Sequence, residues 1–258
     1  LDLYDLHHGN RPKDSSYKST GIIKVFPGSN EGNQYASGNL VSINSKYYFS
    51  TCRHVVMTSD YRIRNIRFIQ LLNNVSLEIE GPIYIFRNTS IPYDYALIEV
   101  KYDPCLEGRS ARISNDSATL SEIVRGVCYR DVNLVYIEGK VVELDQNDPN
   151  SYQTDCGGTH GFSGAGYFDE HGDLKVIHRV GGYFLGEESE DIYYHQKYFK
   201  KSNTPLITSI KTTFEACNQT NRQESICYNA ISNALNTHAR NPRTMVLGAN
   251  KFYELLIT

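Results

Sequence analysis

The stretch Thr159–Gly166 reads THGFSGAG and places Ser163 inside a frame of small residues. A nucleophilic serine needs its hydroxyl exposed on a sharp turn, with two backbone N–H groups nearby that can hold an oxyanion. Gly161 lets the chain turn so that its own N–H and that of Ser163 point to one spot, and Gly164 follows the serine. The G-x-S-x-G elbow fits worse, because Ala165 stands where that pattern requires glycine. The stretch predicts a nucleophile loop, with a turn that does no chemistry as the alternative.

Short strand-like runs lie on both sides of this loop. Six runs rich in Ile, Val, Tyr and Phe come before Val100, separated by Gly, Asn, Pro and Ser. They predict a first antiparallel barrel over 20–110, with a hairpin turn at Asn44–Ser45. A polar connection over 101–122 leads to a second barrel over 123–200, in which Gly139 is expected at a hairpin position.

The two ends of the chain differ from this β pattern. Residues 1–19 are polar and without a period, and we expect an N-terminal arm. Residues 205–258 have apolar residues three and four apart, which favours a small helical C-terminal extension. This extension is interpreted either as a regulatory or dimerising appendage or as a terminal helix packed on the barrel. The predicted fold class is mostly β, with two antiparallel six-stranded barrels and a small helical C-terminal extension.

Composition excludes several classes of function. The chain has 258 residues, 40% of them apolar and 21% charged, and a formal net charge of −3. No apolar run approaches the roughly 18 residues of a membrane helix, and nothing indicates nucleic-acid binding. Six cysteines without a CxxC pair predict no structural metal, and no cofactor is implied. The even number of cysteines and several N-x-Ser/Thr sequons leave disulfides and secretion open, although we favour an intracellular, reduced protein.

Two further segments complete a constellation with Ser163. The run STCRHVV ends a predicted strand at His54, where an imidazole could act as a general base. The run YDYALIEV places Asp94 immediately before an apolar strand. Each residue alone suits a structural role, as a strand-end histidine or a turn aspartate. Together they give the chain order His, Asp, Ser.

These three blocks, STCRHVV, YDYALIEV and GTHGFSGAGYF, resemble the catalytic blocks of chymotrypsin-like serine proteases, over about residues 20–190. The resemblance implies that Ser163 is the nucleophile, His54 the general base and then acid, and Asp94 the group that orients the imidazole. It also implies an oxyanion hole formed by the N–H groups of Gly161 and Ser163. The substrate would be a polypeptide.

A histidine in the run KVIHRVGG resembles the specificity histidine of glutamyl endopeptidases and of nidovirus and picornavirus main proteases, which cleave after Glu or Gln. An imidazole N–H can donate to a carboxylate or carboxamide oxygen. We therefore expect His178 to bind substrate, with Thr159 and His160 beside it; a histidine in the core is the alternative for His178. Gly157 stands where trypsin-like enzymes carry their pocket aspartate, which argues against cleavage after Lys or Arg.

The chain begins LDLYD and lacks an Ile-Val-Gly-Gly activation terminus, which favours a viral or bacterial type similar to torovirus-like main proteases. We expect a processed viral polyprotein product in the host-cell cytoplasm, with secretion as the alternative, and a homodimer through the extension as one assembly. A second hypothesis is a protease-fold nuclease acting on cyclic dinucleotides through Tyr193 and Lys197. A third is an inactive protease-fold binding module.

Overall fold

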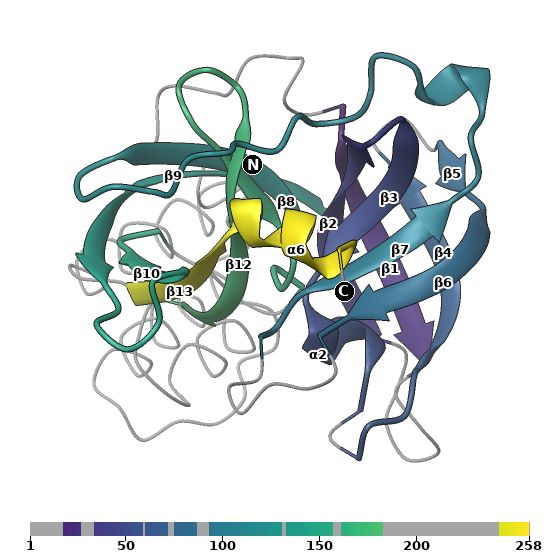
Figure 1. Ribbon diagram of the computed structural model, residues 1–258, viewed down its shortest axis with the longest axis horizontal. Helices are drawn as coiled ribbons and strands as arrows, with labels where there is room; N and C mark the ends of the chain where they lie inside the picture. Colours follow the sequence, from purple (N-terminus) through teal and green to yellow (C-terminus); the bar gives the residue numbers. More distant parts are fainter. Residues whose placement is uncertain are drawn as a thin grey trace, which may run out of the picture.

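The computed structural model describes residues 18–26, 34–58, 60–71, 75–86, 93–130, 133–156, 161–182 and 243–257. These residues form two β units that lie next to each other (Figure 1). The first is a curved seven-stranded sheet, and the second is a closed barrel of six strands. The mostly β fold class predicted from the sequence is confirmed.

The first unit contains strands β1 to β7 in the hydrogen-bonded order β5-β4-β1-β2-β3-β7-β6. Their bounds are β1 Thr20–Phe26, β2 Gln34–Ile43, β3 Lys46–Thr51, β4 Asn65–Leu71, β5 Ser76–Leu77, β6 Ile79–Ile85 and β7 Ala96–Val100. All the pairs in this sheet are antiparallel. Side chains such as Ile23, Leu40, Phe49 and Ile98 are fully buried beneath it.

The hairpin predicted at Asn44–Ser45 is confirmed. Ile43 pairs with Lys46, and the two turn residues have φ of 50° and 64°. Two successive positive φ values are those of a type I′ turn, whose twist matches that of the flanking strands. The hairpin fixes the register of β3 and thereby the place where the chain leaves the sheet at Thr51.

The first unit differs from the predicted closed six-stranded barrel in its edges. In the described part of the chain, β5 and β6 end the sheet on opposite sides and do not pair with each other. Pro82 lies inside β6, where a residue without an N–H cannot donate to a neighbouring strand. The register of β6 on β7 also shifts between Ile79 and Ile83. In the described residues the sheet curls without closing.

The second unit is a barrel in the order β10-β13-β12-β11-β8-β9. Its strands are β8 Ile123–Arg130, β9 Asn133–Leu144, β10 Ser151–Thr154, β11 Gly166–Phe168, β12 Leu174–Gly182 and β13 Arg243–Gly248. Gly139 lies inside β9 opposite Val124, so its predicted hairpin position is wrong. A Cβ at Gly139 would come within 2.4 Å of the Cys156 sulfur, so close packing explains this glycine.

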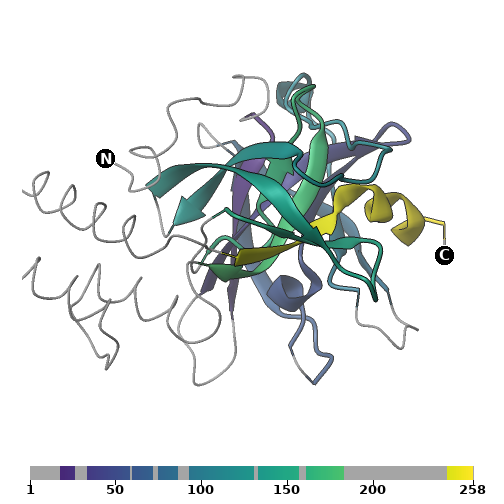
Figure 2. The same cartoon turned by 90° about the vertical axis from the view of Figure 1, so that its left-hand side faces the viewer.

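Strand β13 corrects the predicted C-terminal boundary. Residues 243–248 were expected in a helical extension, but they pair with β10 on one side and with β12 on the other. A short apolar run such as TMVL has no periodicity that separates a strand from a helix, and its partners lie far away in sequence. Figure 2 shows β13 among the barrel strands, continuing into the C-terminal helical turns. The rest of the predicted extension, 205–242, lies outside the described residues, as do 1–17 and 183–200.

The C-terminal helical turns join the two units. They comprise η3 at Ala249–Lys251 and α6 at Phe252–Leu255, and α6 crosses the middle of Figure 1. Phe252 and Leu255 are buried in the core cluster of the first sheet, and the Phe252 ring packs edge-on against Tyr95 at 5.1 Å. This end of the chain is therefore a terminal helix packed on the protein's own core. None of the helices in the described ranges has the length and apolar character needed to cross a bilayer.

The connection predicted over 101–122 also ties the units together. It contains η2, Pro104–Leu106, and it touches strands from both sides. Ala111 forms a bridge with Val41 of the first sheet, and Ile113 forms one with Leu174 of the barrel. The site described below is positioned by this shared framework.

Candidate active site

His54 lies on a single helical turn that follows the hairpin strand β3. This turn, α2, spans Arg53–Val56, and it buries Val55 and Val56 while its other side faces outward. The His54 side chain keeps 43% of its surface exposed. The apolar pair anchors the turn, and the imidazole stands at the edge of the sheet where a substrate could reach it.

Asp94 comes two residues before strand β7, which pairs with β3. Because β3 and β7 are neighbours, the residues beyond Thr51 and before Ala96 meet at the same end of the sheet. The Asp94 carboxylate accepts the His54 backbone N–H at 2.8 Å on Oδ1 and approaches His54 Nδ1 at 2.5 Å with Oδ2. Two contacts from one residue fix the ring relative to the carboxylate.

Ser163 is brought to the same place from the second barrel. The His54 Nε2 to Ser163 Oγ distance is 2.9 Å. The flanking glycines have a left-handed backbone, with φ of 91° at Gly161 and 89° at Gly164, which suits the turn expected there. The structure therefore assembles the three residues that the sequence singled out, across 109 residues of chain between His54 and Ser163.

The first sheet holds the serine loop from below. The Ser37 N–H donates to the Ser163 carbonyl at 3.0 Å, and the Ser37 hydroxyl donates to the Gly161 carbonyl at 2.7 Å. A Cβ at Gly164 would lie 2.2 Å from the Ser37 carbonyl and 2.3 Å from Thr51 Oγ1, so only glycine fits. The nucleophile loop is thus seated on strands β2 and β3.

The environment of Asp94 keeps its carboxyl group ionised. Burial raises its pKa, but the hydrogen bonds and charge of His54, together with the charge of Arg179, outweigh that effect and lower it. Arg179 Nε lies 3.6 Å from Asp94 Oδ2. An ionised carboxylate on Nδ1 favours the tautomer with the proton on Nδ1, so that Nε2 can accept a hydrogen bond from the Ser163 hydroxyl.

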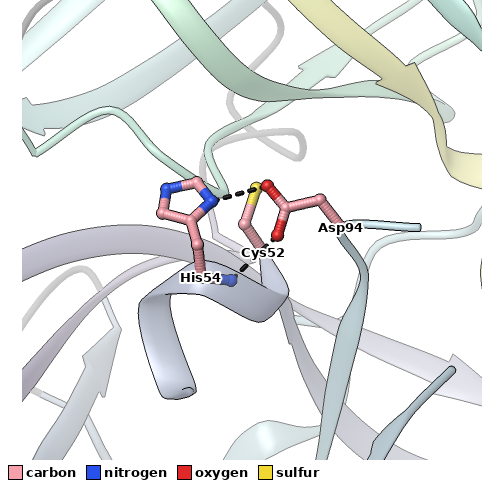
Figure 3. Close-up of side chains that lie close together, drawn as sticks. All are labelled: Cys52, His54 and Asp94. Carbon is pink, nitrogen blue, oxygen red and sulfur yellow. Dashed lines mark hydrogen bonds and ion pairs between the residues drawn. The ribbon is translucent and has the colours of Figure 1, made fainter. Parts of the chain in front are cut away.

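Cys52 lies beside this pair (Figure 3). Its sulfur, His54 Nδ1 and an Asp94 oxygen lie within 4.8 Å of one another, which is a spacing that a metal ion could use. The thiol instead donates to the His178 carbonyl at 3.1 Å, and burial, then the charge of Asp94, raises its pKa well above the usual value. His54 Nδ1 and the Asp94 carboxylate already form a hydrogen bond with each other. The arrangement therefore fits a hydrogen-bonded His–Asp pair with a neighbouring thiol better than a metal centre.

His178 lies in β12 and is 2% exposed. Its backbone accepts the Gly164 N–H and donates to the Ala165 carbonyl, each at 2.8 Å, so it is bound directly to the nucleophile loop. The ring packs edge-on against Phe162, with centroids 5.9 Å apart, and Nδ1 lies 3.1 Å from the Tyr167 hydroxyl. Burial, then the charge of His54, lowers the pKa of His178 to about 3, so this imidazole is neutral at physiological pH.

Several predicted residues are outside the described ranges. Thr159 and His160, expected beside the substrate, belong to 157–160, and Tyr193 and Lys197, named for the nuclease hypothesis, belong to 183–200.

Sequence reasoning gave no role to Ser37, Tyr167 or Arg179. Ser37 and Arg179 contact the site from segments far from their partners in the chain. A contact between Tyr167 and His178 could have been suspected, because Tyr167 lies in the short strand β11 just after Ser163, and β11 pairs with β12, which carries His178. No local pattern identifies the other two.

No protein-family model and no curated protein sequence matches the chain. Solved structures do. A thermostable serine protease, AL20, from an extremophilic microorganism superposes with a TM-score of 0.54 and 14% identity over 66% of this chain and 88% of its own. A Glu endopeptidase superposes with a TM-score of 0.51 and 16% identity over 67% of this chain and 84% of its own.

The fold is therefore that of the chymotrypsin-like serine proteases. At these identities, the likeness concerns the backbone architecture. The arrangement of His54, Asp94 and Ser163 is an independent observation on this chain.

Proposed function

We propose that this protein is a serine endopeptidase that cleaves polypeptides through an acyl-enzyme at Ser163. The observation that carries the proposal is the continuous chain of contacts from Asp94 through His54 to Ser163, at 2.5 and 2.9 Å. Such a chain is the geometry that activates a serine hydroxyl for attack on a carbonyl. It occurs here on a fold shared with serine proteases.

In the acylation step, Ser163 Oγ attacks the scissile carbonyl carbon while its proton passes to His54 Nε2. His54 then gives that proton to the leaving amine as the C–N bond breaks, and the acyl group remains on Ser163. A water molecule reverses the roles: its proton goes to His54, its oxygen attacks the ester, and Ser163 recovers its proton as the acid product leaves. Asp94 remains ionised throughout and stabilises the imidazolium that forms in each half.

The oxyanion is assigned to the N–H groups of Gly161 and Ser163. The Phe162 carbonyl accepts the Ala165 N–H at 2.8 Å inside the loop. The Phe162 C=O and the Ser163 N–H belong to the same trans peptide and point in opposite directions. Because the carbonyl points into the turn, the Ser163 N–H points away from it. The positive φ of Gly161 supports an orientation of its own N–H toward the same point as the Ser163 N–H. Two such donors would stabilise the tetrahedral intermediate by roughly 3 kcal/mol each.

For the substrate, we propose cleavage after Gln, with Glu as the second choice. The Tyr167 hydroxyl beside Nδ1 of a neutral His178 favours the tautomer with the proton on Nε2, which makes that nitrogen a donor. A neutral donor suits a carboxamide oxygen and offers no countercharge to a carboxylate. One neighbour of similar fold is a Glu endopeptidase, which supports an acidic or amide side chain at this position. Thr159 and His160 are proposed as further donors to the same pocket.

Processing of a viral polyprotein and a location in the host-cell cytoplasm stay predictions of the sequence. A homodimer does as well, and Phe252 and Leu255 are already used inside the core, so they would not form its interface.

The test compares the wild type with Ser163→Ala on a peptide library and, in parallel, on a cyclic dinucleotide. Exposed Ser117 in the connection gives a matched control, Ser117→Ala. We expect cleavage after Gln or Glu in the wild type and the control, and a loss of about 10⁴- to 10⁶-fold in Ser163→Ala. Undiminished cleavage by Ser163→Ala would overturn the proposal. Breakdown of the dinucleotide by both the wild type and Ser163→Ala would favour the nuclease.

A further inference from the structure

Arg179 occupies a β-bulge in the strand next to the nucleophile loop. Along β12, His178 pairs with Val246 and Val180 pairs with Met245, so one extra residue is inserted between two consecutive partners on β13. That residue is Arg179. A bulge breaks the regular alternation of side chains and re-aims one of them. Here it turns a barrel side chain toward the other unit.

The guanidinium group reaches Asp94, which belongs to the first sheet. Arg179 Nε and Asp94 Oδ2 are 3.6 Å apart, and their side chains are 32% and 11% exposed. The same Oδ2 faces His54 Nδ1, and Oδ1 accepts the His54 backbone N–H. The carboxylate thus has a fixed donor on each oxygen and a permanent positive charge on the oxygen that faces the ring.

The other titratable groups near this carboxylate add no charge that could replace Arg179. Cys52, from the residue before α2, is a buried protonated thiol that donates to a backbone carbonyl. Tyr95, the next residue after Asp94, directs its hydroxyl to the Gly248 carbonyl at 2.8 Å. His178 on β12 is neutral because it is fully desolvated.

Arg53, next to His54 on α2, lies over the Tyr61 ring at 5.2 Å from its centroid. Within the described ranges, Arg179 is the one arginine or lysine that forms an ion pair with Asp94.

We propose that Arg179 is a positioning residue for the triad, which holds the Asp94 carboxylate ionised toward His54 and extends the activity of the enzyme to lower pH. This inference rests on the proposed peptidase function. The arginine charge repels the imidazolium form of His54, and this repulsion offsets part of the attraction that Asp94 exerts on that form. Since only the neutral imidazole can accept the Ser163 proton, the arginine preserves the reactive form as the pH falls.

The test is the pH profile of kcat/KM for Arg179→Gln, which keeps a long polar side chain without the charge, and for Arg179→Lys, which keeps the charge. We expect the pH of half-maximal kcat/KM on the acid side to rise by about half a unit to one unit in Arg179→Gln and by less in Arg179→Lys. KM should stay within about twofold, and the plateau of kcat should fall about three- to tenfold as Asp94 loses its outer contact. A control is Arg112→Gln, since Arg112 is exposed and pairs with Asp173 on the barrel surface.

Arg112→Gln should retain the wild-type profile. An unshifted acid limb in Arg179→Gln, with its circular dichroism and melting curve unchanged, would overturn the proposal. A rise of KM alone would do the same, because it would show that the arginine binds substrate.

A second readout does not depend on peptidase activity. The proton between His54 Nδ1 and Asp94 Oδ2 is held in a 2.5 Å contact, so it should give a low-field proton NMR resonance whose pH titration follows the ring. In Arg179→Gln the midpoint of that titration should move up by the same amount as the acid limb. If the wild type shows no Ser163-dependent cleavage but the titration moves, the peptidase function fails while the electrostatic role of Arg179 stands. If the titration does not move, the role fails whatever the activity.

Discussion

The surroundings of His54 and of His178 place the same side chain in opposite physical situations. His54 keeps 43% of its side chain exposed and has an ionised carboxylate at 2.5 Å from Nδ1. His178 is 2% exposed, and its Nδ1 lies 3.1 Å from the Tyr167 hydroxyl. The first ring thus faces both solvent and a countercharge. Burial, then the charge of His54, holds the second ring neutral, with a pKa of about 3.

Under the proposed function, this contrast separates a proton carrier, His54, from a fixed hydrogen-bond donor, His178. A general base must exchange its proton in every turnover, whereas a recognition group must present the same hydrogen to every substrate. Partner and burial decide between the two roles, because the side chain is identical. The two rings are nevertheless linked, since the thiol of Cys52 beside His54 donates to the backbone carbonyl of His178.

The largest effect is expected from His54→Ala. Without the base, kcat/KM should fall by about 10⁴-fold or more, as expected for a residue that acts as a unit with Ser163 and Asp94. Stability should fall by only about 1 kcal/mol, because Asp94 keeps the backbone N–H and Arg179. Peptide hydrolysis and thermal unfolding check both parts. A His54→Ala enzyme within tenfold of the wild type would remove the contrast between the two histidines.

The next largest effect concerns pH and His178. Burial lowers its pKa from 6.5 to about 3, so below pH 6.5 the unfolded chain takes up a proton that the folded protein refuses. The free energy of unfolding should therefore fall with decreasing pH, by about 1.4 kcal/mol per unit between pH 6 and pH 3.5, from this residue alone. Urea unfolding of the wild type and of His178→Gln at several pH values isolates the contribution of His178 to the free energy of unfolding.

The free energy of unfolding of His178→Gln, plotted against pH, should have a smaller slope over that range, by the equivalent of about one proton taken up on unfolding. The carboxylates contribute equally to both proteins. Parallel curves would mean that His178 takes up its proton in the folded state as it does in the unfolded chain.

The smallest effect is expected from Tyr167→Phe, which removes only the hydroxyl beside His178 Nδ1. The stability should fall by about 1 kcal/mol, because one buried nitrogen loses its partner. Preference for Gln over an apolar residue before the cut should fall about tenfold, since the ring is no longer held in one tautomer. Competition between two peptide substrates measures this ratio. A preference equal to that of the wild type would show that Tyr167 does not set the tautomer.

Much of this arrangement could be predicted from local sequence. His54 follows the strand KYYFST by a few residues and Asp94 comes shortly before the strand ALIEV, so both could be expected near the ends of strands. The glycines around Ser163 indicated a tight turn in the loop. Glycine adopts φ values near 90° without strain, whereas they are costly for other residues.

The remainder depends on contacts that no local pattern encodes. Strand β13 reads as a short apolar segment, and only its pairing with β10 and β12 makes it a strand. Arg179 reaches Asp94 because it lies in a β-bulge. That bulge depends on the register between β12 and β13, which are separated by about sixty residues of sequence. The open edges of the first sheet in the described residues, at β5 and β6, also follow from strand pairing that the sequence alone does not show.

The position of β13 also bears on how the molecule folds. Ser151 pairs with Leu247 and Ile177 pairs with the same residue from the other side, so the barrel closes only when the last described strand arrives. Contacts of such long sequence separation are slow to form. The wall that carries His178 and Arg179 is completed by the same event. The contact between His54 and Ser163 is therefore expected to form late in folding, and a partly folded chain would bring His54 and Asp94 together before Ser163 joins them.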